Sequence, residues 1–268
     1  TGCRNVALGY AAMLYNTTAS KNTAVGACAL YSNTTGASNT AVGNDALKTN
    51  TTGASLVGVG YEALAANTTG IRNTALGVYS QRYTSTGQFN TSSGYMSLCS
   101  NSTGCHNTAF GDLALRNNTT ASQNTSVGSC SLVANTTGAN NTAVGFRALV
   151  ANTCGNKNIA VGSYALGANT TGSNNIAIGC TALNVNSTGD NNTSIGTEAL
   201  GANTTGCLNV AIGRQTLYNN TTANQNTAVG ACAMYINTTG TQNDAVGYLV
   251  CKCSGWYMCF TFYYNWAE

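Results

Sequence analysis

A repeat of seventeen residues, which begins at Thr1 and keeps its register, constrains this chain more than any other feature. Rows of seventeen fill residues 1–255 with fifteen copies and leave residues 256–268 as a separate tail. The ninth position of every row is Gly, beginning with Gly9, Gly26 and Gly43. A short period without insertions predicts a stack of identical small units. Positions one to seventeen below are counted from the start of each row.

Seventeen residues are too few for a helical hairpin, but they suffice for one coil of a β-solenoid. In the row 137–153 we expect a strand over 140–144 and a second short strand around 147–150. Gly and Asn, which tolerate positive φ, stand where the chain must turn between them. The sequence therefore predicts an all-β parallel β-solenoid (β-roll) over 1–255, with fifteen coils and no long helix.

Alternation along the strand predicts which side chains form the core. Position six is β-branched and position eight apolar in fourteen rows each, so we expect both to point inward, together with the Leu or Met of position thirteen. Position seven should then point outward, although it is Ala in eleven rows and Ser or Gly in the others, which indicates close packing against another chain or layer. The predicted interface column includes Ala24, Ala41, Ala75, Ala143, Ala160 and Ala177.

Asn recurs at position five in fourteen rows and at position sixteen in thirteen. Stacked at the strand spacing of about 4.8 Å, identical amides can hydrogen-bond along the column as ladders. In twelve rows, however, the Asn of position sixteen also matches the acceptor pattern for N-glycosylation, and the sequence leaves both interpretations open. The candidate glycan sites are Asn16, Asn33, Asn50, Asn67, Asn101, Asn118, Asn135, Asn169, Asn186, Asn203, Asn220 and Asn237.

The segments 158–162, 175–179 and 209–213, which read NIAVG, NIAIG and NVAIG and are each followed by a short Ala-Leu or Thr-Leu element, carry a family resemblance. They resemble the head repeats of trimeric autotransporter adhesins and similar repeats in phage and bacterial fibre proteins. The resemblance covers all fifteen rows and implies a parallel β-roll, often trimeric, on a cell or virion surface. The period of seventeen residues and the many cysteines depart from the adhesin pattern.

Composition narrows the classes of function. Charged residues make up 6 % of the chain and the net charge is +3, which offers no basic stripe for nucleic acid. No apolar run of eighteen residues predicts a membrane span. The chain opens in register at Thr1 without an initiating Met, which favours a processed or partial chain.

Twelve cysteines favour an oxidising compartment. Six of them form a second, longer pattern, because one Cys at position three and one at position eleven of the next row recur together every six rows. We expect disulfides at these sites, either clipping neighbouring coils or, as the favoured alternative, joining adjacent chains. The candidates are Cys3, Cys28, Cys105, Cys130, Cys207 and Cys232.

Few residues offer chemistry, and the sequence predicts no enzyme, metal site or cofactor. His106, the only His, stands at the variable position four and is expected in solvent, whereas Asp244 alone occupies a position expected to face inward. The two rows that span residues 69–102 depart most from the repeat pattern, because Gln81 replaces the core Leu and Ser93 replaces the expected core Val. They predict either a locally softened coil or a contact site.

The aromatic tail, 256–268, is expected to cap the solenoid or to dock onto another subunit.

Three functional hypotheses follow from these patterns. The first is a structural subunit of an extracellular fibre or filament, whose partner is the chain itself as a homo-oligomer, with a trimer among the candidates. The second is a surface adhesin or a phage tail-fibre shaft. An ice-binding protein comes third, because the outward Thr residues that ice binding requires are not expected when position six faces inward.

Overall fold

Each repeat contributes one short strand, which occupies positions six to eight of its row. The computed structural model describes residues 2–250 and 259–260, and it divides the chain into two compact units, Thr1–Asn140 and Asn141–Glu268. The first unit contains β1 (Val6–Leu8), β2 (Thr23–Val25), β3 (Thr40–Val42), β4 (Val57–Val59), β5 (Thr74–Leu76), β6 (Thr91–Ser93), β7 (Thr108–Phe110) and β8 (Thr125–Val127). The second contains β9 (Thr142–Val144), β10 (Ile159–Val161), β11 (Ile176–Ile178), β12 (Thr193–Ile195), β13 (Val210–Ile212), β14 (Thr227–Val229), β15 (Asp244–Val246) and β16 (Cys259–Phe260).

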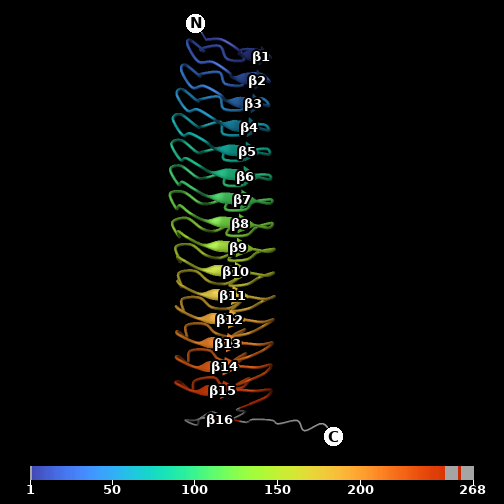
Figure 1. The fold of residues 1–268 in the computed structure, drawn as a ribbon, viewed down its shortest axis with the longest axis vertical. Coiled ribbons are helices and arrows are strands. Elements are labelled where there is room, and N and C mark those ends of the chain that lie inside the picture. Colours follow the sequence, from blue (N-terminus) through green and yellow to red (C-terminus); the bar gives the residue numbers. More distant parts are fainter. Residues whose placement is uncertain (1, 251–258, 261–268) are drawn as a thin grey trace. The chain divides into compact units, whose positions relative to one another are not determined.

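Within each unit the strands pair in parallel and in chain order, as the coloured stack of Figure 1 shows. The register of the pairing equals the repeat, so that Thr23 lies opposite Thr40 and Ile159 opposite Ile176. The chain is thus an all-β parallel β-solenoid with one coil per repeat, and the described residues contain no helix. This confirms the fold predicted from the period.

The rest of each coil is a series of turns rather than a second strand. The segment 147–150, where the sequence predicts a strand, forms turns, and the strand expected over 140–144 is shortened to Thr142–Val144. Backbone hydrogen bonds still join coil to coil outside the strands, as from Leu149 N–H to the Ala165 carbonyl at 3.0 Å. Positive φ angles explain the turns, because positions four and eleven adopt them in every coil and position thirteen in nearly every one.

The core of one coil is small, as row 137–153 illustrates. Five side chains of this row are fully buried, namely Asn141, Ala143, Ala148, Leu149 and Asn152. Only one of them is large, and it supplies the Leu that the sequence predicts for the core at position thirteen. A coil that closes within seventeen residues therefore encloses one Leu, two Ala and two Asn, and it leaves no room for another bulky side chain.

The structure contradicts the predicted direction of the strand side chains. Position seven is buried in the core in every coil except the first, where Ala7 is exposed, whereas position six is mostly half-buried and position eight is mostly exposed. The column Ala24, Ala41, Ala75, Ala143, Ala160 and Ala177 is fully buried inside the coils, so the prediction that it forms an outward interface is wrong. Ala is common there because the narrow interior accepts only a small residue. Asp244, expected to face inward, is exposed because it stands at position six, which points outward.

The tail 256–268 lies outside the described residues except for the backbone of β16, which pairs with β15. Its expected role as a cap or a docking segment stays a prediction, as does the boundary at residue 255.

Candidate functional surfaces

The outward side chains of the strands form one regular surface in each unit, which we call the strand face and define as positions six and eight of all described coils. At position eight a set of apolar side chains is 36–42 % exposed. This set consists of Val42, Val59, Leu76, Phe110, Val127, Val144, Val161, Ile178, Ile195 and Ile212. Thr occupies position six of most coils beside them. Among the described residues the strand face carries a single charge, at Asp244.

The geometry of the strand face follows from parallel pairing in register. Equivalent residues of neighbouring coils are about 4.8 Å apart, and positions six and eight of one coil are about 7 Å apart. Thr and Val are favoured on such a pleated surface because β-branched side chains pack well against their cross-strand neighbours. The result is a row of hydroxyl and methyl groups that runs beside a row of aliphatic groups.

The Asn ladders predicted from the sequence are present. At position five, Asn158 N–H donates to the Asn141 side-chain oxygen at 2.9 Å, and the Asn158 side-chain amide donates to the Gly172 carbonyl at 2.8 Å. At position sixteen, the side-chain amide of Asn186 donates both to the side-chain oxygen of Asn169 and to the Gly189 carbonyl, each at 2.9 Å. These bonds satisfy polar groups that are buried in the core.

The ladders decide between the two interpretations of position sixteen. Ten of the twelve candidate glycan sites are fully buried, Asn237 is 3 % exposed, and only Asn16 is half-buried. The Asn16 side-chain amide also donates a hydrogen bond, to the Ala19 carbonyl at 3.1 Å. An amide that is buried and hydrogen-bonded cannot carry a glycan in the folded chain, so burial argues against a glycan at the eleven buried sites, whereas glycosylation of Asn16 stays a prediction.

The six candidate disulfide cysteines are free thiols in this chain. The Cys3 sulfur lies 3.6 Å from Ser20 Oγ at position three of the next coil, and the Cys232 thiol lies 3.8 Å from Gln215 at position eleven of the preceding one. The cysteines of positions three and eleven thus contact separate columns, and the expected clip between neighbouring coils is wrong. Bridges between chains stay a prediction, which electrophoresis of the denatured protein with and without a reducing agent tests.

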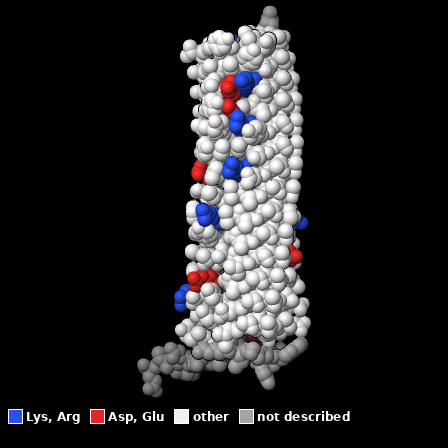
Figure 2. Space-filling view, turned by 180° about the vertical axis from the view of Figure 1, so that it is seen from behind, with Lys and Arg blue, Asp and Glu red and all other residues white. Residues whose placement is uncertain are grey.

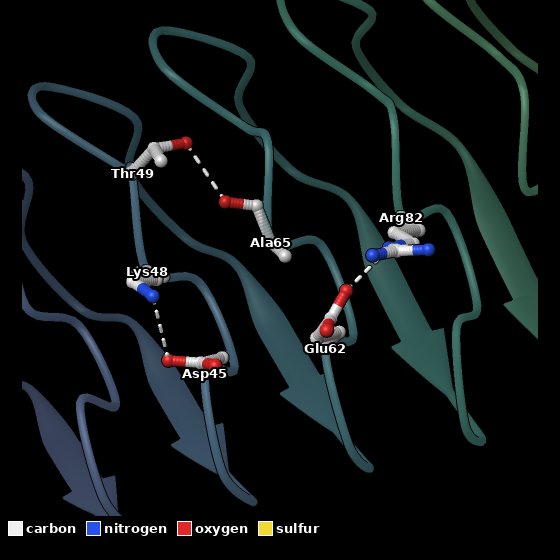
Figure 3. Close-up of polar contacts among 6 residues, drawn as sticks. All are labelled: Asp45, Lys48, Thr49, Glu62, Ala65 and Arg82. Carbon is white, nitrogen blue, oxygen red and sulfur yellow. Dashed lines mark hydrogen bonds and ion pairs between the residues drawn. The ribbon is translucent and has the colours of Figure 1, made fainter.

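A charged groove lies on coils three to five of the first unit, and we call it the first groove. It has a volume of about 310 Å³ and is lined by Asp45, Lys48, Glu62, Ala65, Arg82 and Tyr83, with Thr49 and Ala66. Figure 3 shows Lys48 paired with Asp45, at 3.1 Å, and Arg82 paired with Glu62. The hydrogen bond to Asp45, together with its charge, raises the pKa of Lys48. Figure 2 shows how sparse charged groups are on one face of the molecule.

Aromatic side chains surround this groove. The Arg82 guanidinium lies over the rings of Tyr79 and Tyr83, at 4.8 Å and 4.9 Å from their centroids. Tyr61 packs edge-on against Tyr79, with ring centroids 5.3 Å apart. A hydrogen bond with Glu62 raises the pKa of the Tyr61 hydroxyl. Arginine stacked on tyrosine stays oriented, which fixes the wall of the groove.

A polar core lies in coils five and six, behind Arg82 and Tyr83. The Gln81 side-chain amide is buried and donates to the Thr74 carbonyl at 2.8 Å and to Ser92 Oγ at 2.9 Å. Ser93 belongs to the strand face and is half-buried, so it does not replace a core residue. Residues 69–102 therefore combine a polar core with part of a surface groove, and the two interpretations drawn from the sequence, a softened coil and a contact site, stay predictions.

A second groove lies on coils eleven to thirteen of the second unit. It has a volume of about 220 Å³ and is lined by Thr181, Asn184, Val185, Glu198, Gly201 and Tyr218. Gln215 donates a hydrogen bond to the Glu198 carboxylate at 2.7 Å. The Tyr218 ring stacks on Tyr235 with centroids 5.3 Å apart and an interplanar angle of 6°. The sequence patterns indicated neither this groove nor the contribution of coils three and four to the first one.

His106 is exposed, as expected, and its ring stacks on Phe89 with centroids 4.8 Å apart. Over residues 2–250 and 259–260, no three His, Cys, Asp or Glu side chains gather in a way that could hold a metal ion. The same residues include no helix with the length and apolar character of a membrane span.

Comparisons with known proteins add no relative of this chain. No protein-family model matches it, and neither a search of curated proteins nor one of solved structures finds a match.

Proposed function

We propose that this chain is a structural subunit of an extracellular fibre or filament, built by stacking and lateral association of solenoid chains. The observation that carries the proposal is the strand face, which in each unit exposes a long column of apolar side chains, interrupted by Ser93 in the first unit, with almost no charge. Monomeric soluble proteins rarely leave long apolar patches in water, and such patches mark sites of association. The partner that fits best is another copy, because a flat and uncharged face is complementary to itself.

The size of the strand face supports this proposal. Eight strands spaced about 4.8 Å apart, with a width on the order of 10 Å, give on the order of 400 Å² per unit. An apolar patch of this size is as large as the largest one on a typical monomer, and such patches are often functional. The small core of each coil also supports association. Each coil encloses only one large side chain, so covering its outer face adds to its stability.

Sedimentation velocity of the complete chain tests lateral association. The double variant Val42→Lys, Val59→Lys places two charges on the strand face, and we expect it to release single chains from the assembly. The matched control is Val78→Lys, Leu208→Lys, which changes two apolar side chains of similar exposure at positions ten and four. We expect this control to sediment like the parent protein. A parent protein that sediments as a single chain would rule out the proposal.

Ice binding is a second candidate, because the structure reverses the argument against it. Thr at position six faces outward, so hydroxyl groups recur about every 4.8 Å over the four neighbouring coils that carry Thr74, Thr91, Thr108 and Thr125. Thermal hysteresis of the parent protein, and its loss in Thr108→Lys, would favour this candidate. Without hysteresis in the parent protein, ice binding is excluded. A surface adhesin or tail-fibre shaft is the remaining alternative. A ligand bound in the grooves would favour it.

A further inference from the structure

The two grooves share one layout, although they lie in different units and eight repeats apart in the sequence. In each groove the middle coil has Glu at position eleven and a very small residue at position fourteen. These pairs are Glu62 with Ala65 and Glu198 with Gly201. Glu62 and Glu198 are the only two glutamates among the described residues, so both occur in this setting.

The small residue at position fourteen opens the groove. Most other coils carry a longer side chain there, such as Tyr31, Arg116 or Tyr235. In the second groove the Tyr218 ring lies directly over Gly201, because a methyl group added to this glycine would meet the ring at 2.8 Å. In the first groove Ala65 forms the floor between Lys48 and Arg82, which stand at position fourteen of the two flanking coils.

The remaining lining residues provide the same kinds of groups in both grooves. A tyrosine of the following coil forms one wall, Tyr83 in the first groove and Tyr218 in the second. Side chains with N–H donors stand on the flanking coils, among them Lys48 in the first groove and Asn184 in the second. Each groove thus combines a carboxylate acceptor, N–H donors and an aromatic ring.

Charge restricts the class of ligand that suits both grooves. The first groove is neutral overall, because Lys48 and Arg82 balance Asp45 and Glu62. Its charge therefore favours neither a cation nor an anion. In the part of the chain that the structure describes, Glu198 forms no ion pair, so the second groove disfavours an anion. A neutral ligand is compatible with both.

We propose that each groove binds one ring of a neutral, hydroxyl-rich ligand, that is, a sugar unit of a neutral glycan. The glutamate accepts hydrogen bonds from ring hydroxyls, and the N–H donors bond to the hydroxyl oxygens. In the first groove Tyr83 covers the C–H face of the ring. In the second groove the two faces of Tyr218 lie against Gly201 and Tyr235, so this tyrosine presents its edge and its hydroxyl to the ligand. The volumes of about 310 and 220 Å³ lie near or below the lower limit for drug-sized ligands and suit one ring. This gives the chain a binding activity in addition to any structural role.

A glycan array probed with the fluorescently labelled complete chain tests this proposal, with neutral and charged glycans printed side by side. We expect the parent protein to bind one or more neutral glycans. The double variant Glu62→Gln, Glu198→Gln keeps the shape of both grooves but removes the carboxylates, and its affinity should fall about ten-fold or more. When Ala65→Tyr is added to this double variant, it fills the first groove with a residue that position fourteen accepts in other coils. We expect it to weaken binding further.

The matched control is Asp112→Asn, which neutralises an exposed carboxylate outside both grooves and should bind as the parent does. Binding of charged glycans alone, no binding to any neutral glycan, or undiminished binding by the double glutamate variant would each overturn the proposal. Sedimentation of the same variants separates it from lateral association, because the grooves share no residue with the strand face. Circular dichroism verifies that each variant is folded.

Discussion

The side-chain amide of Asn203 donates a hydrogen bond of 2.9 Å to the side-chain oxygen of Asn186, its counterpart one coil earlier. The same bond recurs along position sixteen, with every amide pointing toward the preceding coil. Thr84 interrupts this ladder in coil five. There the Asn67 side-chain oxygen and the Thr84 hydroxyl are buried and have no hydrogen-bond partner.

The interruption predicts that Thr84→Asn stabilises the protein. The new amide can donate to the Asn67 oxygen, and its own oxygen can accept from Asn101, which removes buried polar groups without partners. We expect the free energy of unfolding to rise by about 1–3 kcal/mol. Urea unfolding followed by circular dichroism measures this change.

The matched control is Asn186→Thr, which introduces the same interruption into an intact part of the ladder. It should lower the free energy of unfolding by a similar amount. A Thr84→Asn variant that unfolds at lower urea concentration than the parent would show that coil five has no room for the amide.

The burial of position seven predicts that Ala143 cannot be enlarged. Ala143→Leu would overpack a coil that already contains Leu149, and we expect a loss of about 1–3 kcal/mol or more in the free energy of unfolding. The comparison is Val144→Leu at position eight, which points outward and which is already Leu in coil five, at Leu76. We expect that variant to unfold close to the parent in thermal melts. Equal melting temperatures for the two variants would contradict the assignment of position seven to the core.

The two glycine positions of the repeat should differ in their tolerance of Ala. Gly145 has a φ of +134°, which only Gly adopts readily. A Cβ would approach the backbone of the next coil at both positions, 2.6 Å from the Gly162 carbonyl oxygen at Gly145 and 2.4 Å from the Gly172 carbonyl oxygen at Gly155, so the backbone conformation is what distinguishes them. Gly155, at position two, has no such φ, and Ala occupies the same position in three other coils. Gly145→Ala should therefore lower the melting temperature much more than Gly155→Ala. The reverse order would show that coil contacts outweigh the backbone conformation.

Cys99 should be the slowest of the described thiols to react with iodoacetamide. It is 4 % exposed, and burial raises its pKa, so that less of it is thiolate than of an ordinary cysteine at the same pH. Cys154 and Cys180 are exposed and provide the comparison within the same molecule. Timed labelling at pH 8, followed by peptide mass spectrometry, measures the three rates. If Cys99 is labelled as fast as Cys180, the coil around it opens more readily than its burial suggests.

The seventeen-residue period by itself determined the architecture of this protein. Gly at position nine of every row, together with Asn at positions five and sixteen, predicted stacked coils joined by amide ladders. The reason is that residues at the same position of successive rows lie next to one another in the stack. A residue that recurs at one position therefore contacts its own copies in the neighbouring coils.

The tertiary structure alone decided which face of the strand is inside. Alternation separates positions six and eight from position seven, but it is equally consistent with either side facing the core. The narrow interior of the coil, set by the positive φ angles at positions four, eleven and thirteen, accepts Ala and excludes Val. The grooves also required the structure, because Glu62 and Arg82 stand in different rows of the sequence and meet only when successive coils stack.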